Sequence, residues 1–118
     1  MTSLTIARNR LAAAFPDSYP LSKGHTLIVP FRHEDDFFKL TEEELQAMHA
    51  LVRSVRRKLD RPNAPDAYNI GLNIGAAAGQ TIAHVHLNVI PRYSGDVADP
   101  RGGVRWVIAS KARYWSEE

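Results

Sequence analysis

Residues 84–91, with the sequence HVHLNVIP, constrain the fold most strongly because polar and apolar residues alternate without a break from 84 to 89. The polar members are His84, His86 and Asn88. The apolar members facing the other way are Val85, Leu87 and Val89. A period of two is typical of a β-strand with one buried face, and along such a strand the two imidazoles would lie about 7 Å apart. We expect Pro91 to end this strand.

Residues 42–60 carry the clearest helix pattern in the chain. Thr41 followed by Glu44 forms a capping box, which marks a helix N-terminus. The apolar residues that recur at steps of three and four are Leu45, Met48, Val52, Val55 and Leu59. Such a stripe buries one face of a helix against a core. Because proline cannot continue a helix, we expect Pro62 to stop it.

Three further stretches have strand patterns. Residues 25–30 (HTLIVP) are rich in β-branched residues, residues 67–75 (AYNIGLNIG) contain two glycines, and residues 104–109 (VRWVIA) predict one more short strand. Glycine within a strand often marks close approach of a ligand or another backbone. Residues 4–15 fit either a strand or a short helix. The order of elements predicts an α+β fold with an antiparallel sheet.

Composition narrows the class of protein further. The 118 residues are 44% hydrophobic and include no cysteine, which excludes disulfides, zinc fingers and thiol nucleophiles. No apolar run reaches the 18 residues or so that a membrane span needs, and the first residues do not resemble a secretory signal. We therefore expect a cytoplasmic protein with a single domain over residues 1–118, ending in a surface tail from about residue 109.

The charge pattern says less about partners. The net charge is only +2, although basic residues gather in two groups. These are Arg53, Arg56, Arg57, Lys58 and Arg61, and then Arg101, Arg105, Lys111 and Arg113. No aromatic residues are interleaved with the first group, so a solvated helix face is favoured over a nucleic-acid surface. We expect neither nucleic acid nor membrane as a partner.

The polar face of residues 84–88 has three interpretations. It can be a solvent-facing strand surface, or a metal site with a third ligand from His25, Asp17 or Asp96. It can also hold a nucleophilic imidazole, since residues 79–81 (GQT) offer N–H groups and a hydroxyl that suit a phosphate better than a cation. Spacing alone leaves all three open.

Four blocks of the sequence together resemble one family. Residues 79–93 (GQTIAHVHLNVIPRY) are similar to the signature of the histidine-triad (HIT) family of nucleotidyl hydrolases and transferases, whose motif is His–φ–His–φ–His–φ–φ with φ apolar. Residues 23–33, 68–81 and 95–108 resemble further family segments in the same order, the last resembling the tail of a bacterial branch close to diadenosine polyphosphate hydrolases. The resemblance implies a five-stranded antiparallel sheet with one long and one short helix, and a homodimer.

The resemblance also assigns roles to individual residues. His86 matches the nucleophile, whose ring nitrogen attacks the α-phosphorus to give a nucleotidyl-histidine. His84 and His25 match histidines that support the site. Asn88 stands where the family has its third histidine, and it can donate a hydrogen bond but not a titratable proton. The residues matched to nucleotide-binding positions are Asp17, Asn73, Gly79, Gln80, Thr81 and Phe15.

These matches imply a hydrolase or transferase acting on a dinucleoside polyphosphate or a nucleotide phosphoramidate. If proton transfer by the third histidine matters, Asn88 would slow the reaction by about 10²–10⁴-fold. The alternative is a purine-nucleotide-binding protein with little or no turnover. We expect no metal site and no required cofactor, with Mg²⁺ entering, if at all, together with the substrate.

Overall fold

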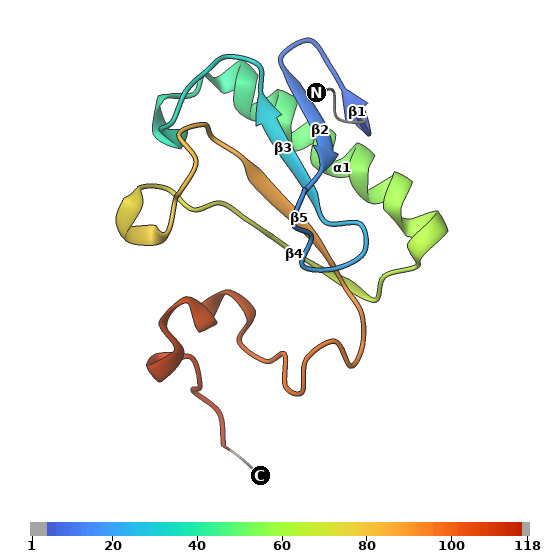
Figure 1. The fold of residues 1–118 in the computed structure, drawn as a ribbon, viewed down its shortest axis with the longest axis vertical. Helices are drawn as coiled ribbons and strands as arrows, with labels where there is room; N and C mark the ends of the chain where they lie inside the picture. The colour runs from blue at the N-terminus through green and yellow to red at the C-terminus, as the bar shows by residue number, and fades with distance from the viewer. Residues whose placement is uncertain (1–4, 117–118) are drawn as a thin grey trace.

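One antiparallel sheet and one long helix form the body of the computed structural model, which describes residues 5–116. The strands lie in the order β1-β2-β3-β5-β4, and the helix α1, Glu42–Asn63, crosses one face of the sheet (Figure 1). The strands are β1 (Ala7–Arg8), β2 (Ala12–Pro16), β3 (Thr26–Pro30), β4 (Ala67–Gly71) and β5 (Leu87–Arg92). Three short 3₁₀ helices complete the order: η1 (Phe37–Lys39), η2 (Ala76–Ala78) and η3 (Gly103–Lys111). The predicted α+β fold with five antiparallel strands is confirmed.

The helix begins where its capping box predicts. The Thr41 hydroxyl accepts a hydrogen bond from the Glu44 N–H at 3.1 Å, and the Glu44 carboxylate accepts one from the Thr41 N–H at 2.8 Å. The Arg32 guanidinium also donates to both Glu44 oxygens, at 3.0 and 2.9 Å. These bonds hold the pKa of the buried Glu44 carboxyl at about 2, below its ordinary value of 4.5. The segment after β3 is thereby tied to the start of α1.

The predicted end of the helix is wrong by one turn. Helix α1 continues through Pro62 to Asn63. Because proline has no N–H, the helix loses one hydrogen bond at this position, the one to the Lys58 carbonyl. The next turn closes without it, because the Ala64 N–H donates to the Asp60 carbonyl at 3.1 Å with Ala64 in the left-handed region, at φ 47°.

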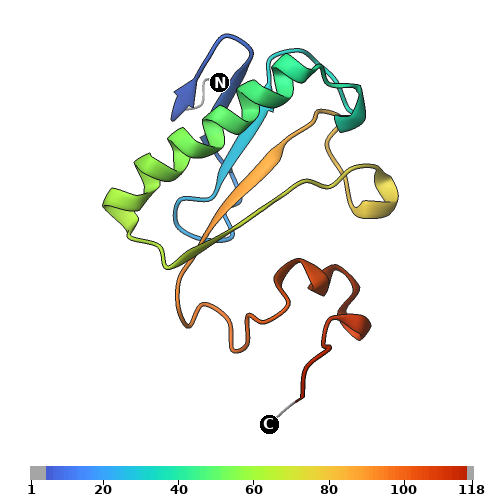
Figure 2. The same cartoon turned by 180° about the vertical axis from the view of Figure 1, so that it is seen from behind.

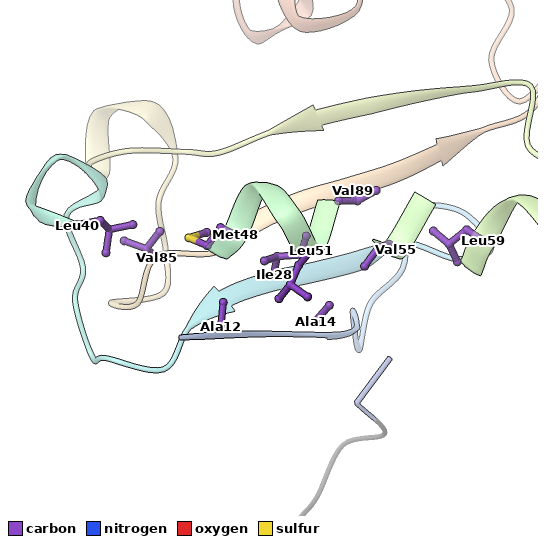
Figure 3. Close-up of a cluster of buried hydrophobic side chains, with 10 residues drawn as sticks. All are labelled: Ala12, Ala14, Ile28, Leu40, Met48, Leu51, Val55, Leu59, Val85 and Val89. Atoms are coloured by element: carbon purple, nitrogen blue, oxygen red, sulfur yellow. The ribbon is translucent and has the colours of Figure 1, made fainter. Parts of the chain in front are cut away.

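The core lies between α1 and the sheet, as the helix stripe predicts. Figure 3 shows Met48, Leu51 and Val55 of α1 gathered with Ile28 of β3 and Val89 of β5 in one buried cluster. The other buried members are Ala12, Ala14, Leu40, Leu59 and Val85. Leu45, Val52 and Leu87 pack against this cluster from its margin. The apolar half of the alternating run therefore faces the helix, as predicted.

Several strand boundaries differ from those predicted. The ambiguous residues 4–15 form β1 and β2, with Leu4 outside the described residues. Strand β5 begins only at Leu87, so the two histidines of the alternating run precede the strand. It also continues past Pro91 to Arg92. Its pairing with β3 stops at Val89, and β4 is then its sole neighbouring strand, so a missing N–H is tolerated on the other side.

Residues 67–75 and 104–109 are also corrected. Strand β4 pairs only as far as Gly71. The predicted strand at 104–109 lies instead within the 3₁₀ turns of η3. The segment folds on itself there, because the Arg105 guanidinium donates to the Lys111 and Ala112 carbonyls and the Trp106 indole donates to the Arg101 carbonyl. With these bonds made inside the segment, it has no strand partner.

The last part of the chain leaves the body of the fold. Both views show the segment after β5 lying below the sheet and away from α1 (Figures 1 and 2). The radius of gyration is 15.3 Å, above the 13.5 Å or so expected for a compact domain of this length. Among residues 5–116, no helix is long and apolar enough to cross a bilayer.

Candidate functional site

The sheet face opposite α1 carries the candidate site. Strand register places Phe15 opposite Leu27, Leu27 opposite Asn88, and Asn88 opposite Gly71. Directly paired residues share one face of a sheet, so these four positions form a row across β2, β3, β5 and β4. Because Ile28 and Val89 belong to the core under α1, this row faces the other way.

His25 is buried at the start of β3, and its hydrogen bonds define its tautomer. The Leu21 backbone N–H donates to its Nδ1 at 3.0 Å. A ring nitrogen that accepts a bond carries no proton, so the neutral ring carries its proton on Nε2. Nε2 lies 2.9 Å from the Asn88 Oδ1 and 3.4 Å from the Asp17 Oδ2. His25 therefore donates toward the amide oxygen of Asn88.

The same bond orients the Asn88 amide. Its oxygen faces the His25 N–H, and its nitrogen lies 3.3 Å from the Gly71 carbonyl, which can only accept. The three hydrogen bonds therefore form a chain in which each group donates to the next. The Leu21 N–H donates to His25, His25 donates to Asn88, and Asn88 donates to the Gly71 carbonyl. Apart from its two chain neighbours, no residue between 5 and 116 lies within 4 Å of the position that a Gly71 Cβ would occupy. The glycine therefore leaves open space beside Asn88.

His84 and His86 lie on the turn that leads into β5. The His84 Nε2 lies 3.0 Å from the Pro30 carbonyl, and the His86 Nδ1 lies 3.0 Å from the carbonyl of His84. Because carbonyl oxygens only accept, both ring nitrogens are N–H donors. In the neutral His86 ring the lone pair then sits on Nε2, which has no hydrogen-bond partner among residues 5–116. The His86 side chain is partly exposed.

His33 was not singled out in the sequence, although it belongs to this region. Its ring centroid lies 5.1 Å from that of His84, with the two planes tilted by 56°. His33 is exposed and follows β3. The sequence could have indicated His33 through its position in residues 23–33, which resemble a segment of the family.

Phe15 lies near the end of strand β2, and Asp17 follows the strand beside His25. The Asp17 Oδ1 accepts a hydrogen bond from the Tyr19 N–H at 2.9 Å, while its Oδ2 faces His25. Asp17 and His25 are among the residues that line a mostly apolar hollow of about 290 Å³. Phe15 is partly buried and belongs to the row on the sheet face opposite α1, which we call the open face. Asp17 thus lies close to His25, whereas Phe15 lies in the same row as Leu27 and Asn88.

Gln80 shapes the loop that precedes the histidines. Its side-chain oxygen accepts from the Gly75 N–H at 2.8 Å, and its amide nitrogen donates to the carbonyls of Asp35 and Ile82 at 2.9 and 3.1 Å. Its backbone N–H donates to the Gly75 carbonyl. Each of these polar groups is engaged within the protein. Gln80 therefore clamps residues 75–82 against the segment before η1.

Unlike Gln80, two of the other predicted residues, Thr81 and Asn73, keep side-chain polar groups that have no hydrogen-bond partner within residues 5–116. Gly79 has φ 98°, a conformation that favours glycine, and its N–H donates to Ala76. Thr81 is exposed, and neither its N–H nor its hydroxyl bonds to another group within residues 5–116. The exposed Asn73 side chain likewise makes no hydrogen bond within that range. Thr81 and Asn73 can therefore donate to a ligand.

No three histidine, aspartate or glutamate side chains converge as metal ligands within residues 5–116. Of the candidate third ligands, His25 is engaged with Asn88, and Asp96 pairs with Arg92 at 2.8 Å. The structure brings the predicted residues His25, Asn88 and Asp17 together. The sequence did not indicate the backbone partners Leu21, Pro30 and Gly71, because these bonds use main-chain atoms that any residue type can supply.

Comparison with known proteins identifies the family. The HIT domain matches residues 1–95, so this chain belongs to the HIT family. It is 40% identical over 93 residues to an uncharacterized HIT-like protein of Mycoplasma genitalium, covering 79% of this chain and 66% of the relative. It is 35% identical over 94 residues to the AP-4-A phosphorylase of Mycobacterium tuberculosis, covering 79% of this chain and 48% of that protein. The chain thus spans about half to two thirds of the length of these relatives.

A further relative and a solved structure agree with this assignment. The asymmetrical bis(5′-nucleosyl)-tetraphosphatase of Schizosaccharomyces pombe is 37% identical over 92 residues, covering 78% of this chain and 50% of that enzyme. The crystal structure of a HIT family protein from Bacillus anthracis superposes with a TM-score of 0.77 at 32% identity, covering 81% of this chain and 68% of that one. The HIT fold predicted from the sequence is confirmed.

Proposed function

We propose that this protein is a nucleotide hydrolase or nucleotidyl transferase. It acts at the α-phosphate of a dinucleoside polyphosphate or a nucleotide phosphoramidate. The His86 Nε2 forms a bond to the α-phosphorus as the bond to the leaving group breaks. Water then cleaves the phosphorus–nitrogen bond, which releases the nucleoside monophosphate and restores the imidazole. The similarity to an AP-4-A phosphorylase and a bis(5′-nucleosyl)-tetraphosphatase supports this class of substrate.

The observation that carries the proposal is the 3.0 Å contact between the His86 Nδ1 and the carbonyl of His84, which assigns the tautomer of His86. Its Nδ1 is held as a donor by the carbonyl of His84, so the lone pair of the neutral ring is on Nε2. Nucleophilic attack by imidazole needs such an unprotonated nitrogen. Because Nε2 has no partner in residues 5–116 and the side chain is partly exposed, a phosphorus atom can approach it.

The surrounding groups suit a nucleotide. Thr81 and Asn73 offer donors that a phosphate oxygen can accept, and Asp17 can accept from ribose hydroxyls through its Oδ2. Phe15 offers an aromatic ring in the row that also holds Asn88. We propose that the clamp made by Gln80 holds the Thr81 donors in place, rather than that its side-chain amide binds phosphate.

The proposal extends to the assembly. Strand β4 lies at one edge of the sheet, where Ile70 is exposed, and its outer side has no strand partner within residues 5–116. Pairing of β4 with that of a second copy would continue the sheet, which supports a homodimer. The reaction needs no resident metal ion, and Mg²⁺ would arrive with a polyphosphate substrate. The protein is proposed to work in the cytoplasm.

A second candidate function is nucleotide binding without turnover. The neutral amide of Asn88, in place of an imidazole, favours this alternative because it cannot transfer a proton. Calorimetry with adenosine monophosphate, combined with product analysis, separates the two functions. Binding without any product from substrates of either class would support the second.

The test of the first proposal is a brief incubation with diadenosine tetraphosphate, quenched and analysed by mass spectrometry. We expect the mass of one nucleotidyl group on the peptide that contains His86. His86→Gln should abolish the adduct, whereas His49→Gln, on the exposed side of α1, should retain it. Turnover without an adduct on His86, or an adduct that survives His86→Gln, would overturn the mechanism.

A further inference from the structure

The proposed nucleophile His86 and two further histidines, His84 and His25, each direct an N–H group at a protein oxygen. The His84 Nε2–H faces the Pro30 carbonyl, the His86 Nδ1–H faces the carbonyl of His84, and the His25 Nε2–H faces Asn88. Each arrangement is fixed by a partner that can only accept or only donate, apart from Asn88, whose amide is then oriented by His25. Each of these three N–H groups is therefore already engaged with an oxygen of the protein.

Asn88 does not supply the missing proton. Its oxygen accepts from His25, and one of its amide hydrogens is directed at the Gly71 carbonyl at 3.3 Å. The second amide hydrogen can stabilise a negative oxygen through a hydrogen bond, but it is not transferable at neutral pH. The Asp17 carboxylate already faces His25 and the Tyr19 N–H. Position 88 is therefore a fixed neutral donor.

We infer that this site prefers nucleotide anhydrides, whose leaving groups need no proton, over phosphoramidates. The inference rests on the proposed function and selects between its two substrate classes. When His86 attacks an anhydride, the phosphorus–oxygen bond breaks and the electron pair leaves on a phosphate oxygen. Phosphate has its second pKa near 6, so that oxygen departs as a stable anion at pH 7.

A phosphoramidate makes a different demand. When its phosphorus–nitrogen bond breaks, the electron pair stays on nitrogen, which must gain a proton to leave as a neutral amine. A general acid in that position contributes about 10²–10⁴-fold to rate. Since Asn88 lacks such a proton and the neighbouring histidines donate elsewhere, the proton must come from water. We therefore expect the phosphoramidate, whose leaving group is an amine, to react more slowly than the anhydride.

His33 is the one other imidazole in contact with this group, through its ring contact with His84. Because it is exposed, it must be tested as an alternative acid. His33→Gln serves as this control. If His33 were the acid, that substitution would slow the phosphoramidate selectively and leave the anhydride reaction intact.

The test uses a series of nucleoside 5′-aryl phosphates, in which the nucleotide stays constant and the pKa of the leaving phenol varies. We expect log kcat/KM of the unmodified protein to fall steeply with leaving-group pKa, and adenosine 5′-phosphoramidate to react at least about 100-fold more slowly than diadenosine tetraphosphate. Asn88→His should flatten the slope and raise the phosphoramidate rate about 100-fold. Asn88→Gln, which restores no acid, should keep the slope steep.

The outcomes separate the inference from the function on which it rests. A shallow slope in the unmodified protein, or a phosphoramidate cleaved as fast as the tetraphosphate, would overturn the inference and leave the proposed function standing. Absence of turnover and of a His86 adduct with every substrate would overturn both. The slope in the unmodified protein needs no variant, so a poorly folded Asn88→His does not remove the test.

Discussion

The two faces of the sheet are built from the same strands but hold their side chains in different ways. Under α1, Ile28 and Val89 are fully buried among aliphatic neighbours, so shape and exclusion of water fix their positions. On the open face, His25 and Asn88 are held by directional hydrogen bonds that end on backbone groups. The first face should therefore control stability, and the second should control reactivity with little effect on stability.

The largest effect is expected on the open face. His86→Ala removes the proposed nucleophile and should lower kcat by about 10⁴-fold or more, equivalent to about 5.5 kcal/mol in barrier height. Because the His86 side chain is partly exposed and bonds only to the neighbouring His84 carbonyl, the urea midpoint should barely change. Steady-state kinetics and urea titration would check both. A strongly destabilised variant would break the proposed separation of the two faces.

The opposite substitution is Ile28→Ala in the core. It removes buried methyl and methylene groups beneath α1 and should cost about 2–5 kcal/mol in the free energy of unfolding. We expect kcat per folded molecule to stay within a factor of two or so, measured at a temperature where the variant remains folded. A selective loss of kcat in the folded variant would show that the core face also sets the geometry of the site.

A third substitution tests the connection between the sheet and α1. Glu44→Gln removes the charge that pairs with Arg32, at the cost of about 1–3 kcal/mol in unfolding free energy, a range that allows for the half-exposed Arg32. Glu43→Gln is the matched control on the exposed side of the same turn.

The pH dependence sharpens this prediction. The pKa of Glu44 in the folded protein, about 2, is below the ordinary value of 4.5, so its charged form stabilises the fold fully above about pH 4.5. That stabilisation should be lost as the pH falls from about 4.5 through 2. Urea titrations over this range should show a shallower decline for Glu44→Gln than for the unmodified protein. Equal declines would contradict the assigned ion pair.

The smallest effect is expected for His25. His25→Phe leaves the Asn88 oxygen without its donor and allows the amide to turn, so we expect kcat to fall about tenfold with little change in KM. His25→Gln keeps an N–H donor and should recover part of the loss. If both variants match the unmodified protein, His25 does not position Asn88.

The sequence predicts the core face better than the open face. The stripe from Leu45 to Leu59 and the capping box at Thr41 are local patterns, and the structure confirms both. Pro62 and Pro91 were expected to end their helix and strand, but both elements continue past them. A proline ends an element only where its missing N–H breaks a hydrogen bond that the element needs, and the sequence does not show which acceptor that N–H would have had. Residues 104–109 misled because an apolar run becomes a strand only beside a partner strand, and here Arg105 and Trp106 close the segment on itself.

The site is predictable only in its side chains. The family resemblance brings His25, His86 and Asn88 into one site, and strand pairing explains why Asn88 faces β4. The direction of each hydrogen bond depends on Leu21, Pro30 and Gly71 through their backbone atoms, which any residue type can supply. Spacing in the sequence therefore could not show which ring nitrogen of His86 carries the lone pair.

The most direct test of that claim is the tautomer of each histidine in the ligand-free protein, measured by long-range ¹H–¹⁵N NMR correlation above pH 8 and assigned by single substitutions. The account predicts Nε2–H for His25 and His84, and Nδ1–H for His86. An Nε2–H signal for His86 would contradict it, because the nitrogen proposed to attack phosphorus would already hold a proton.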